Sequence, residues 1–292
     1  MKYLFMRYPG GKFKAVTFSY DDGSVHDIRL VEILNKFGMK CTFNFHNSVL
    51  ENPSPEKISF EEINKKILAN GHEVAVHGKT HAALGITPSV NGVREVLEGR
   101  LGLEKLFNRI IRGFAYPDTM KNISGDKYET IKSYLKEISL VYGRTCFFDF
   151  HDILTDSDAF ALPEDWYFWV PTAHHDNKKI FDYIEKFMAL DEAKIYRASR
   201  YPRLFYIWGH SFEFEHKGNW AHFEELCNAL SGKEDIWYAT NIEIYDYVKA
   251  YESLVLSADC TKIYNPTLYE IWFTADNVLY SVKPGETITI ND

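Results

Sequence analysis

Two hydrophobic periods alternate along most of the chain. Short apolar runs, typical of buried strands, are followed by longer segments in which apolar residues recur every three or four positions, as on one face of a helix. Residues 14–19 form the first expected strand, and residues 26–37 form the helix that follows and ends at Gly38. Further strands are expected at residues 41–45, 73–76, 113–116, 140–142 and 204–208, and further helices at residues 60–69, 93–108, 128–137, 177–189 and 220–230.

Repeated strand-then-helix units predict an α/β fold with a parallel sheet, because each parallel strand needs a crossover connection. The sheet is expected to be a closed barrel or an open, doubly wound sheet. Polar residues follow several of the expected strands, namely the pair Asp21 and Asp22, then His77 and His210. In parallel α/β folds the carboxyl ends of the strands carry the functional site, so these side chains are predicted to meet.

The end of the chain has a different pattern. After residue 253 only short strand-like runs remain, at residues 254–256, 271–273 and 287–290, with turn-forming residues such as Asn265-Pro266 and Pro284-Gly285 between them. We therefore expect a catalytic domain over residues 1–252 and a small C-terminal β appendage over residues 253–292.

Composition excludes several classes of protein. The chain has 292 residues, 46% hydrophobic and 25% charged, which is typical of a globular protein. A net charge of −8 argues against nucleic-acid binding. Four cysteines without paired spacing are expected to be free thiols. No apolar run approaches the ~20 residues of a membrane span, and no leader is evident at the start, so a cytoplasmic location without a membrane partner is expected, with a removed leader left open.

Two short segments carry candidate metal ligands. His77-Gly-Lys-Thr-His81 places two imidazoles four positions apart, in a strand-to-loop setting because Gly78 disfavours a helix. Asp21-Asp22-Gly23 taken alone is typical of a turn. Together, one carboxylate and two imidazoles suit Zn²⁺ or Co²⁺ and leave coordination positions open. A second carboxylate beside the ligand can then accept a proton from water that the metal has acidified.

These segments resemble a known family. Thr17-Phe18-Ser19-Tyr20-Asp21-Asp22-Gly23 is similar to the first motif of the polysaccharide deacetylases (the NodB homology domain, carbohydrate esterase family 4), usually Thr-Phe-Asp-Asp-Gly. Residues 71–81, GHEVAVHGKTH, resemble the second motif, Gly-His-Glu-(x)3-His-(Ser/Thr)-x-x-His. The resemblance covers about residues 13–250. It implies a distorted (β/α) barrel with about seven parallel strands.

The resemblance also implies roles for individual residues. Asp21 would be the catalytic base, and Asp22, His77 and His81 would hold one divalent metal ion, zinc or cobalt first, with nickel, manganese or iron as alternatives. His210, in Tyr206-Ile207-Trp208-Gly209-His210, resembles the histidine of the late Leu-x-His motif, which acts as the general acid. A histidine suits this role because its pKa lies near the working pH.

The chain departs from the family pattern at three places. Ser19 and Tyr20 precede the Asp pair as two extra residues, and Gly78 replaces the usual Ser or Thr. The third motif, normally Arg-x-Pro-aromatic, is RGFAYP at residues 112–117, with alanine at the arginine that pairs with the base. Arg112 is not expected to reach Asp21, which leaves open how the base is tuned. Tyr116 is expected to offer its backbone N–H to the developing oxyanion.

Two further segments contain candidate residues. PEDWYFW at residues 163–169 resembles the Asp-Trp motif, so Asp165 is expected to hold His210, and Trp166 and Trp208, with Tyr116, are expected to line the substrate site. His174-His175-Asp176 is interpreted as a solvated helix start capped by Asp176 or Asn177, because adjacent histidines on a strand point to opposite faces.

The expected function is a metal-dependent hydrolase of C–N amide bonds other than peptide bonds, acting as a deacetylase on an N-acetylated carbohydrate. A first alternative is a hydrolase of cyclic amides, ureides or other small acylated amines, which the absence of a leader favours. A second alternative, from another class, is a sugar-binding protein without catalytic activity. The sequence does not specify the native metal, the acyl group or the oligomeric state.

Overall fold

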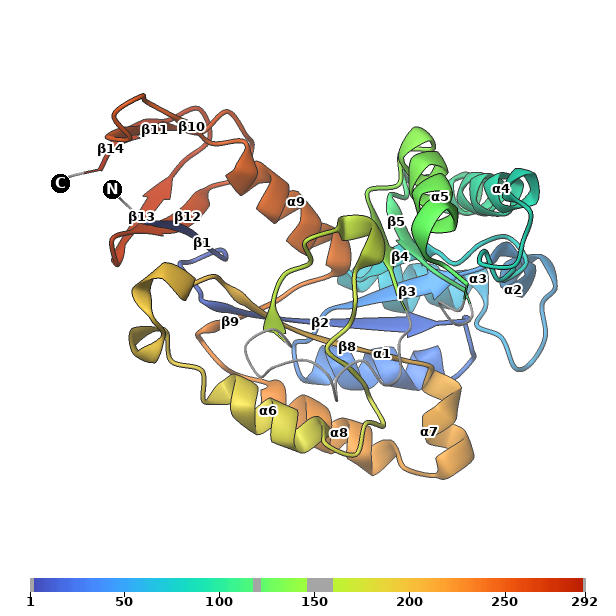
Figure 1. Cartoon of the computed structure of the whole chain (residues 1–292). Helices are drawn as coiled ribbons and strands as arrows, with labels where there is room; N and C mark the ends of the chain where they lie inside the picture. Colours follow the sequence, from blue (N-terminus) through green and yellow to red (C-terminus); the bar gives the residue numbers. More distant parts are fainter. Residues whose placement is uncertain (1–2, 118–121, 146–159, 291–292) are drawn as a thin grey trace.

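A parallel sheet of eight strands forms the centre of the molecule (Figure 1). The computed structural model describes residues 3–117, 122–145 and 160–290. The strand order is β6-β5-β4-β3-β2-β8-β7, and β9 pairs with the first half of β2. The strands are β2 (Lys14–Asp21), β3 (Cys41–Phe45), β4 (Glu73–Val76), β5 (Gly113–Ala115), β6 (Tyr142–Arg144), β7 (Ala173–His174), β8 (Arg203–Gly209) and β9 (Ile236–Tyr238). This confirms the distorted barrel expected from the family resemblance.

One chain segment joins the two edges of this sheet. Trp169 exchanges backbone hydrogen bonds with β6, since its N–H donates to Gly143 O at 2.9 Å and its carbonyl accepts from Thr145 N at 2.9 Å. A few residues later Thr172 N–H donates to Tyr206 O of β8 at 2.8 Å. The segment therefore curls the sheet into a closed but irregular ring, which brings strands that are distant in the sheet order across from each other.

Helices cover the outside of the sheet. In Figure 1, α1, α6, α7 and α8 lie along one side, and α4 and α5 lie on the other. The helices are α1 (Asp27–Lys36), α2 (Asn47–Glu51), α3 (Phe60–Glu62), α4 (Ser89–Phe107), α5 (Gly125–Glu137), α6 (Ile180–Met188), α7 (Ser211–Lys217), α8 (Trp220–Leu230) and α9 (Asn241–Glu252).

Alternation along β2 separates the two faces of the sheet. Val16, Phe18 and Tyr20 belong to the apolar cluster that includes residues of α1 and α8. The intervening side chains face the barrel interior, where Thr17 Oγ1 donates to Asn241 Oδ1 at 3.0 Å and Ser19 Oγ accepts from Asn44 at 2.8 Å. Asp21 lies on this same interior face. The two extra residues of the first motif therefore keep the carboxylate on the interior face, because an insertion of two preserves the parity of a strand.

Most expected elements are present, but some differ in type or position and others were not expected. The helix expected at residues 60–69 is α3 followed by a π-helical turn, Ile63–Ile67, and a 3-10 turn, Leu68–Asn70. The strand expected at residues 140–142 lies at Tyr142–Arg144 instead. Helix α9 was not expected, although Thr240 and Glu243 form a capping box at its start, which is a signal that the sequence contains.

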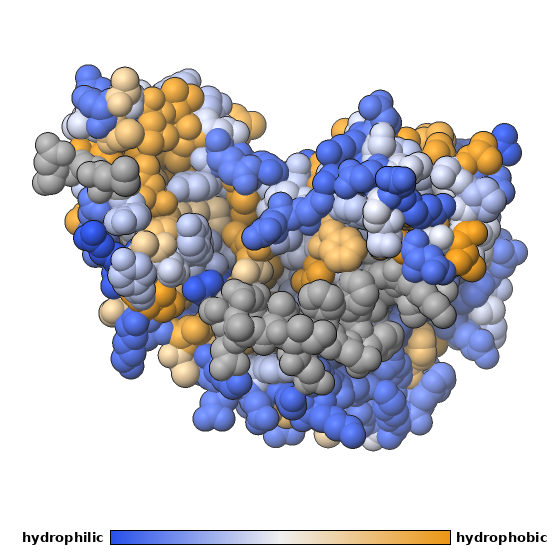
Figure 2. All heavy atoms as spheres, viewed as in Figure 1, coloured by the Kyte–Doolittle hydropathy of each residue, from blue (hydrophilic) through white to orange (hydrophobic). Residues whose placement is uncertain are grey.

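The C-terminal residues form two small antiparallel sheets beside the amino ends of the parallel strands (Figure 1). One sheet also contains β1 (Leu4–Arg7), in the order β1-β12-β13, and the other has the order β10-β11-β14. Their strands are β10 (Val255–Leu256), β11 (Lys262–Tyr264), β12 (Ile271–Ala275), β13 (Val278–Val282) and β14 (Thr287–Thr289). Figure 2 shows this appendage as a lobe separated by a notch from the surface over α4 and α5. The domain boundary after residue 252 stays a prediction.

Two sequence expectations concern thiols and membranes. Cys41, Cys227 and Cys260 are free, and Cys146 lies outside the described residues. Within the described ranges, none of the helices combines the length and the apolar character needed to cross a bilayer.

A buried carboxylate joins α1 to α7. Asp27, in the first turn of α1, is fully buried, and its Oδ1 accepts a hydrogen bond from Ser211 Oγ at 2.5 Å. Its Oδ2 has no hydrogen-bond partner among the described residues. Burial raises the pKa of Asp27 to about 8, because the charged form loses its hydration and the hydrogen bond from Ser211 does not offset this loss.

We expect Asp27→Asn to stabilise the chelator-treated protein at high pH. The pKa of about 8 in the folded state exceeds the ordinary value of 3.8, so the folded state holds the proton more tightly. The free energy of unfolding of the wild type therefore decreases as the pH rises from about 4 to 8. The free energy of unfolding of the variant should therefore exceed that of the wild type by more than about 1 kcal/mol at pH 8. Urea unfolding from pH 4 to 8 measures this, and a gap that does not shrink toward pH 4 would contradict the assignment.

Candidate active site

The three predicted metal ligands converge near the carboxyl ends of β2 and β4. Asp22 Oδ1 lies 3.5 Å from His77 Nε2 and 3.4 Å from His81 Nε2. In a tetrahedral site with bonds of about 2.0–2.1 Å, ligand atoms lie about 3.3–3.4 Å apart. Asp22 thus lies at ligand spacing from both histidines, and one ligand atom of each of the three residues lies within 4.8 Å of the others, as one cation requires.

The backbone at this site adopts conformations that side chains usually avoid. Asp22 and His81 have φ values of 77° and 64°, in the left-handed region. Gly78 has φ 82°, and a Cβ there would meet Glu95 Oε1 at 2.7 Å. That carboxylate accepts hydrogen bonds from Thr80 N at 2.6 Å and Ala82 N at 3.2 Å, and so holds the loop that carries His81. This explains why glycine replaces the usual Ser or Thr.

The polar atoms of this site fit a cation. His77 is 1% exposed, and its Nδ1 donates to Ala115 O at 3.0 Å, which leaves Nε2 free of the proton and directed at Asp22. Both His77 Nε2 and Asp22 Oδ1 are buried without a hydrogen-bond partner among the described residues. Buried polar atoms are rarely left unpaired in proteins, and a divalent cation would satisfy both.

The predicted base is held by an arginine that the sequence reasoning missed. Asp21 is 2% exposed, and both of its carboxylate oxygens lie 2.5 Å from Arg144 of β6. Asn44 Nδ2 donates to the same carboxylate at 2.7 Å, and Asp21 Oδ2 lies 3.9 Å from His77 Nε2. Burial opposes ionisation, but the Arg144 guanidinium outweighs it together with His77 and His210, and the pKa of Asp21 is lowered to about 2. The carboxylate is therefore ionised at any ordinary pH.

Arg112, the arginine of the third motif, does not contact the base. Its guanidinium pairs with both carboxylate oxygens of Asp246 on α9. Arg144 lies one strand further along the sheet and reaches Asp21 across the barrel interior. Its position at the end of a strand was a signal in the sequence, but the expected strand ended two residues too early.

His210 lies on the other side of Asp22. Its Nε2 is 3.7 Å from Asp22 Oδ2, and its Nδ1 donates to Glu213 Oε1 at 2.7 Å. Burial lowers the pKa of His210, but the hydrogen bond to Glu213 and the charges of Asp21 and Asp22 outweigh it, and the pKa is raised. The ring can thus carry a proton on Nε2, the atom that faces Asp22.

Comparison with known proteins gives one matching family model. Residues 6–134 match the model of the polysaccharide deacetylases. This part of the chain, slightly less than half of it, is similar to the polysaccharide deacetylase family. A search of curated proteins gives no significant match.

Solved structures of similar fold are distant in sequence. A Mycobacterium smegmatis protein assigned to the polysaccharide deacetylases is 18% identical, with a TM-score of 0.55 over 84% of this chain and 93% of that one. A mutant of the Bacillus subtilis peptidoglycan deacetylase PdaC is 18% identical, with a TM-score of 0.50 over 84% and 96%. Puue allantoinase is 12% identical, with a TM-score of 0.56 over 82% and 91%. At these identities the likeness shows the fold.

Asp165 does not hold the histidine of the late deacetylase motif, so that expectation is wrong. Its carboxylate accepts hydrogen bonds from Tyr128 Oη at 2.6 Å, Lys132 Nζ at 2.5 Å and Tyr167 N at 2.9 Å. Glu213 takes the position instead, because it lies three residues after His210, in the first turn of α7, where the two side chains share a face.

The residues expected to line the substrate site are interior residues. The N–H of Tyr116 already donates to Arg144 O at 2.9 Å, so it is not directed at an oxyanion, and its hydroxyl donates to Tyr167 O. Trp166 and Trp208 are 8% and 1% exposed. Trp166 packs edge-on against Trp169, and Trp208 lies under the Arg144 guanidinium. Both indoles therefore contribute to the core and present no open face for a sugar ring.

The interpretation of His174-His175-Asp176 as a solvated helix start is also wrong. His174 and His175 are 6% and 0% exposed, and α6 begins only at Ile180. Strand β7 ends at His174, so the alternation rule does not extend to His175, and the two rings lie 4.3 Å apart between centroids.

His46, to which the sequence assigned no role, has its ring centroid 5.5 Å from that of His81.

We expect Arg144→Met to destabilise the protein by about 3–5 kcal/mol, since it leaves the Asp21 carboxylate buried and unpaired. The matched variant Arg112→Met removes a more exposed pair with Asp246 and should cost about 1 kcal/mol or less. Chemical unfolding measures both. Asp21→Asn combined with Arg144→Met should recover part of the loss, and an additive double variant would count against direct pairing.

Proposed function

We propose that this protein is a metal-dependent hydrolase of C–N amide bonds that removes acetyl groups from an N-acetylated carbohydrate. The observation that supports this most is the placement of five side chains around one point. Asp22, His77 and His81 have the spacing of cation ligands, while Asp21 lies beside His77 and His210 lies beside Asp22. A base and an acid flanking a cation site is the arrangement that amide hydrolysis needs.

Each group has a distinct task in the proposed reaction. When bound by Asp22, His77 and His81, the cation supplies polarisation of the amide carbonyl and acidifies water. Asp21 accepts the proton of the attacking water, and Arg144 and Asn44 keep its carboxylate ionised and oriented. The buried ion pair prevents rotation of the carboxylate, so the oxygen nearest to His77 stays directed into the site.

His210 is proposed to protonate the departing amine. Glu213 accepts the Nδ1 proton, so the second proton of the ring is carried by Nε2, the atom that faces Asp22. The same carboxylate favours the protonated ring, which lets histidine act as an acid near neutral pH. Glu213 is thus a positioning residue for the acid, in the way that a buried carboxylate orients the imidazole of a hydrolase triad.

A cyclic amide or ureide is the second candidate substrate class. The fold is shared with an allantoinase at a TM-score of 0.56. The proposed base, acid and cation act on the carbonyl and nitrogen of any amide, so they do not select a sugar. The interior positions of Trp166 and Trp208 also remove the stacking surfaces that would favour a polymer.

The metal-loaded protein should release acetate from N-acetylglucosamine oligomers, lose this activity with a chelator and regain it with Zn²⁺ or Co²⁺. Asp22→Ala and His81→Ala should each lower kcat/KM by about 10²-fold or more, whereas His216→Gln, an exposed histidine on α7, should not. Acetate release and the opening of a cyclic ureide are measured side by side. Turnover of the ureide alone would move the proposal to the second substrate class, and turnover of neither would contradict it.

His210→Ala should lower kcat on the amide by roughly 10²–10⁴-fold, and Glu213→Gln by a smaller factor, with KM nearly unchanged in both. An aryl acetate, whose leaving group departs without protonation, should show a much smaller loss in both variants. Glu215→Gln on the same helix is the matched control. Equal losses on the amide and the aryl ester would rule out the acid role of His210.

A further inference from the structure

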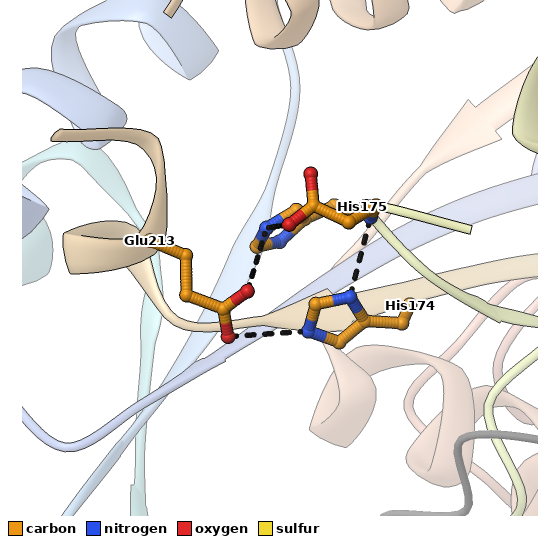
Figure 3. Close-up of side chains that lie close together, drawn as sticks. His174, His175 and Glu213 are labelled. Carbon is orange, nitrogen blue, oxygen red and sulfur yellow. Dashed lines mark hydrogen bonds and ion pairs between the residues drawn. The ribbon is translucent and has the colours of Figure 1, made fainter. Parts of the chain in front are cut away.

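A second group of imidazole and carboxylate side chains lies between the end of β7 and the start of α7. It consists of His174, His175, Asp176 and Glu213. Each residue offers one potential metal-ligand atom, an imidazole nitrogen or a carboxylate oxygen, and these atoms all lie within 4.8 Å of one another. Figure 3 shows the rings of His174 and His175 with the carboxylate of Glu213 turned toward both. None of these residues is assigned to the cation of the first site.

His175 is the unusual member of this group. Its side chain is fully buried, and its ring stacks between Phe214, at 4.1 Å between centroids, and Tyr20, at 5.7 Å. Neither ring nitrogen of His175 has a hydrogen-bond partner among the described residues. A buried imidazole without hydrogen bonds is costly, which indicates that Nε2 is arranged for another partner.

The distances around His175 Nε2 match those of the first site. Asp176 Oδ2 lies at 3.3 Å and Glu213 Oε2 at 3.5 Å, compared with 3.4 Å and 3.5 Å around Asp22 Oδ1. At both sites these close contacts leave a buried imidazole nitrogen, His77 Nε2 or His175 Nε2, without a hydrogen-bond partner in the described part of the chain, as expected for atoms directed at a common point. We propose that His175, Asp176 and Glu213 bind a second divalent transition-metal cation, for which one imidazole and two carboxylates are suitable ligands.

His174 has a different task in this site. Its Nδ1 accepts a hydrogen bond from the Asp176 N–H at 3.2 Å, so the proton of the neutral ring lies on Nε2, which is 3.3 Å from Glu213 Oε1. A protonated nitrogen cannot ligate a metal. His174 therefore acts as a positioning residue that holds the backbone of one ligand and the carboxylate of another.

Lys217 is the competitor for this site. Its Nζ contacts Asp176 Oδ2 and lies 3.2 Å from Glu213 Oε2, so an ammonium group neutralises the carboxylates in this structure. Its side chain is 49% exposed, whereas those of Asp176 and Glu213 are 21% and 17% exposed. The lysine can swing into solvent and open a path to the carboxylates, while the ligands stay in place.

The second cation would be linked to the catalytic groups. Glu213 presents Oε2 to His175 and Oε1 to the Nδ1 proton of His210, and His210 in turn faces Asp22. Binding at Oε2 would fix the carboxylate that orients the proposed acid. The cation site itself rests only on the geometry of its ligands.

Zinc content tests the site without reference to turnover. The full chain, without a polyhistidine tag, is freed of metal and dialysed to equilibrium against Zn²⁺, and zinc per chain is measured by atomic emission. The wild type is expected to hold two equivalents. Asp22→Asn with His81→Gln, which disables the first site, is expected to hold one, and adding His175→Asn is expected to remove it.

Matched variants in the background lacking the first site keep the test decisive. Asp176→Asn, at a half-buried position tolerant of change, should weaken zinc binding, and Lys217→Gln should strengthen it by removing the competing ammonium. His216→Gln, on the same helix outside the cluster, should leave one equivalent, and circular dichroism confirms folding. If the Asp22→Asn, His81→Gln variant binds no zinc, even when Lys217→Gln is added, the second site is overturned. If the wild type is inactive on every amide but binds zinc that is lost in the His175→Asn variant, the hydrolase proposal is rejected and the second cation site stands.

Discussion

The buried ion pair between Asp21 and Arg144 depends on closure of the barrel, and the active-site geometry depends on both. In the sheet order, three strands separate β2 from β6. At about 4.8 Å between neighbouring strands, a flat sheet would hold these two strands roughly 19 Å apart. Both carboxylate oxygens of Asp21 instead lie 2.5 Å from the guanidinium. The segment around Trp169, hydrogen-bonded toward β6 and β8, provides the closure that makes this contact.

The closed barrel explains why polar groups occupy its interior. Thr17, Ser19 and Asp21 alternate with apolar residues along β2 and find partners on β3, β6 and α9. These three side chains of β2 are thereby paired, which is the condition for burying them without a large cost. Among the buried polar atoms that lack a hydrogen-bond partner in the described residues, His77 Nε2, Asp22 Oδ1 and both ring nitrogens of His175 lie where cations are proposed.

The departures from the family pattern redistribute tasks among neighbouring elements. The arginine that pairs with the base comes from β6 in place of β5, and the carboxylate that orients the acid comes from α7 in place of the Asp-Trp segment. The interaction of a charged group depends on where its charged atoms lie, so a side chain from a neighbouring element can take the same role. Arg112 and Asp165, freed from these tasks, form ion pairs with Asp246 and Lys132.

The sequence alone determined the alternation of strands and helices, the parallel sheet and the positions of Asp21, Asp22, His77 and His210 at strand ends, with His81 in the segment after His77. These follow from local periodicity and from motifs of short range. It did not reveal Arg144 or Glu213, and it misplaced Asp165, Tyr116 and the two tryptophans. Asp21 and Arg144 are 123 residues apart, so no local pattern in the sequence specifies that the two pair. Only the tertiary structure decided these pairings, since the curvature of the sheet and the exact end of each strand determine which side chains meet.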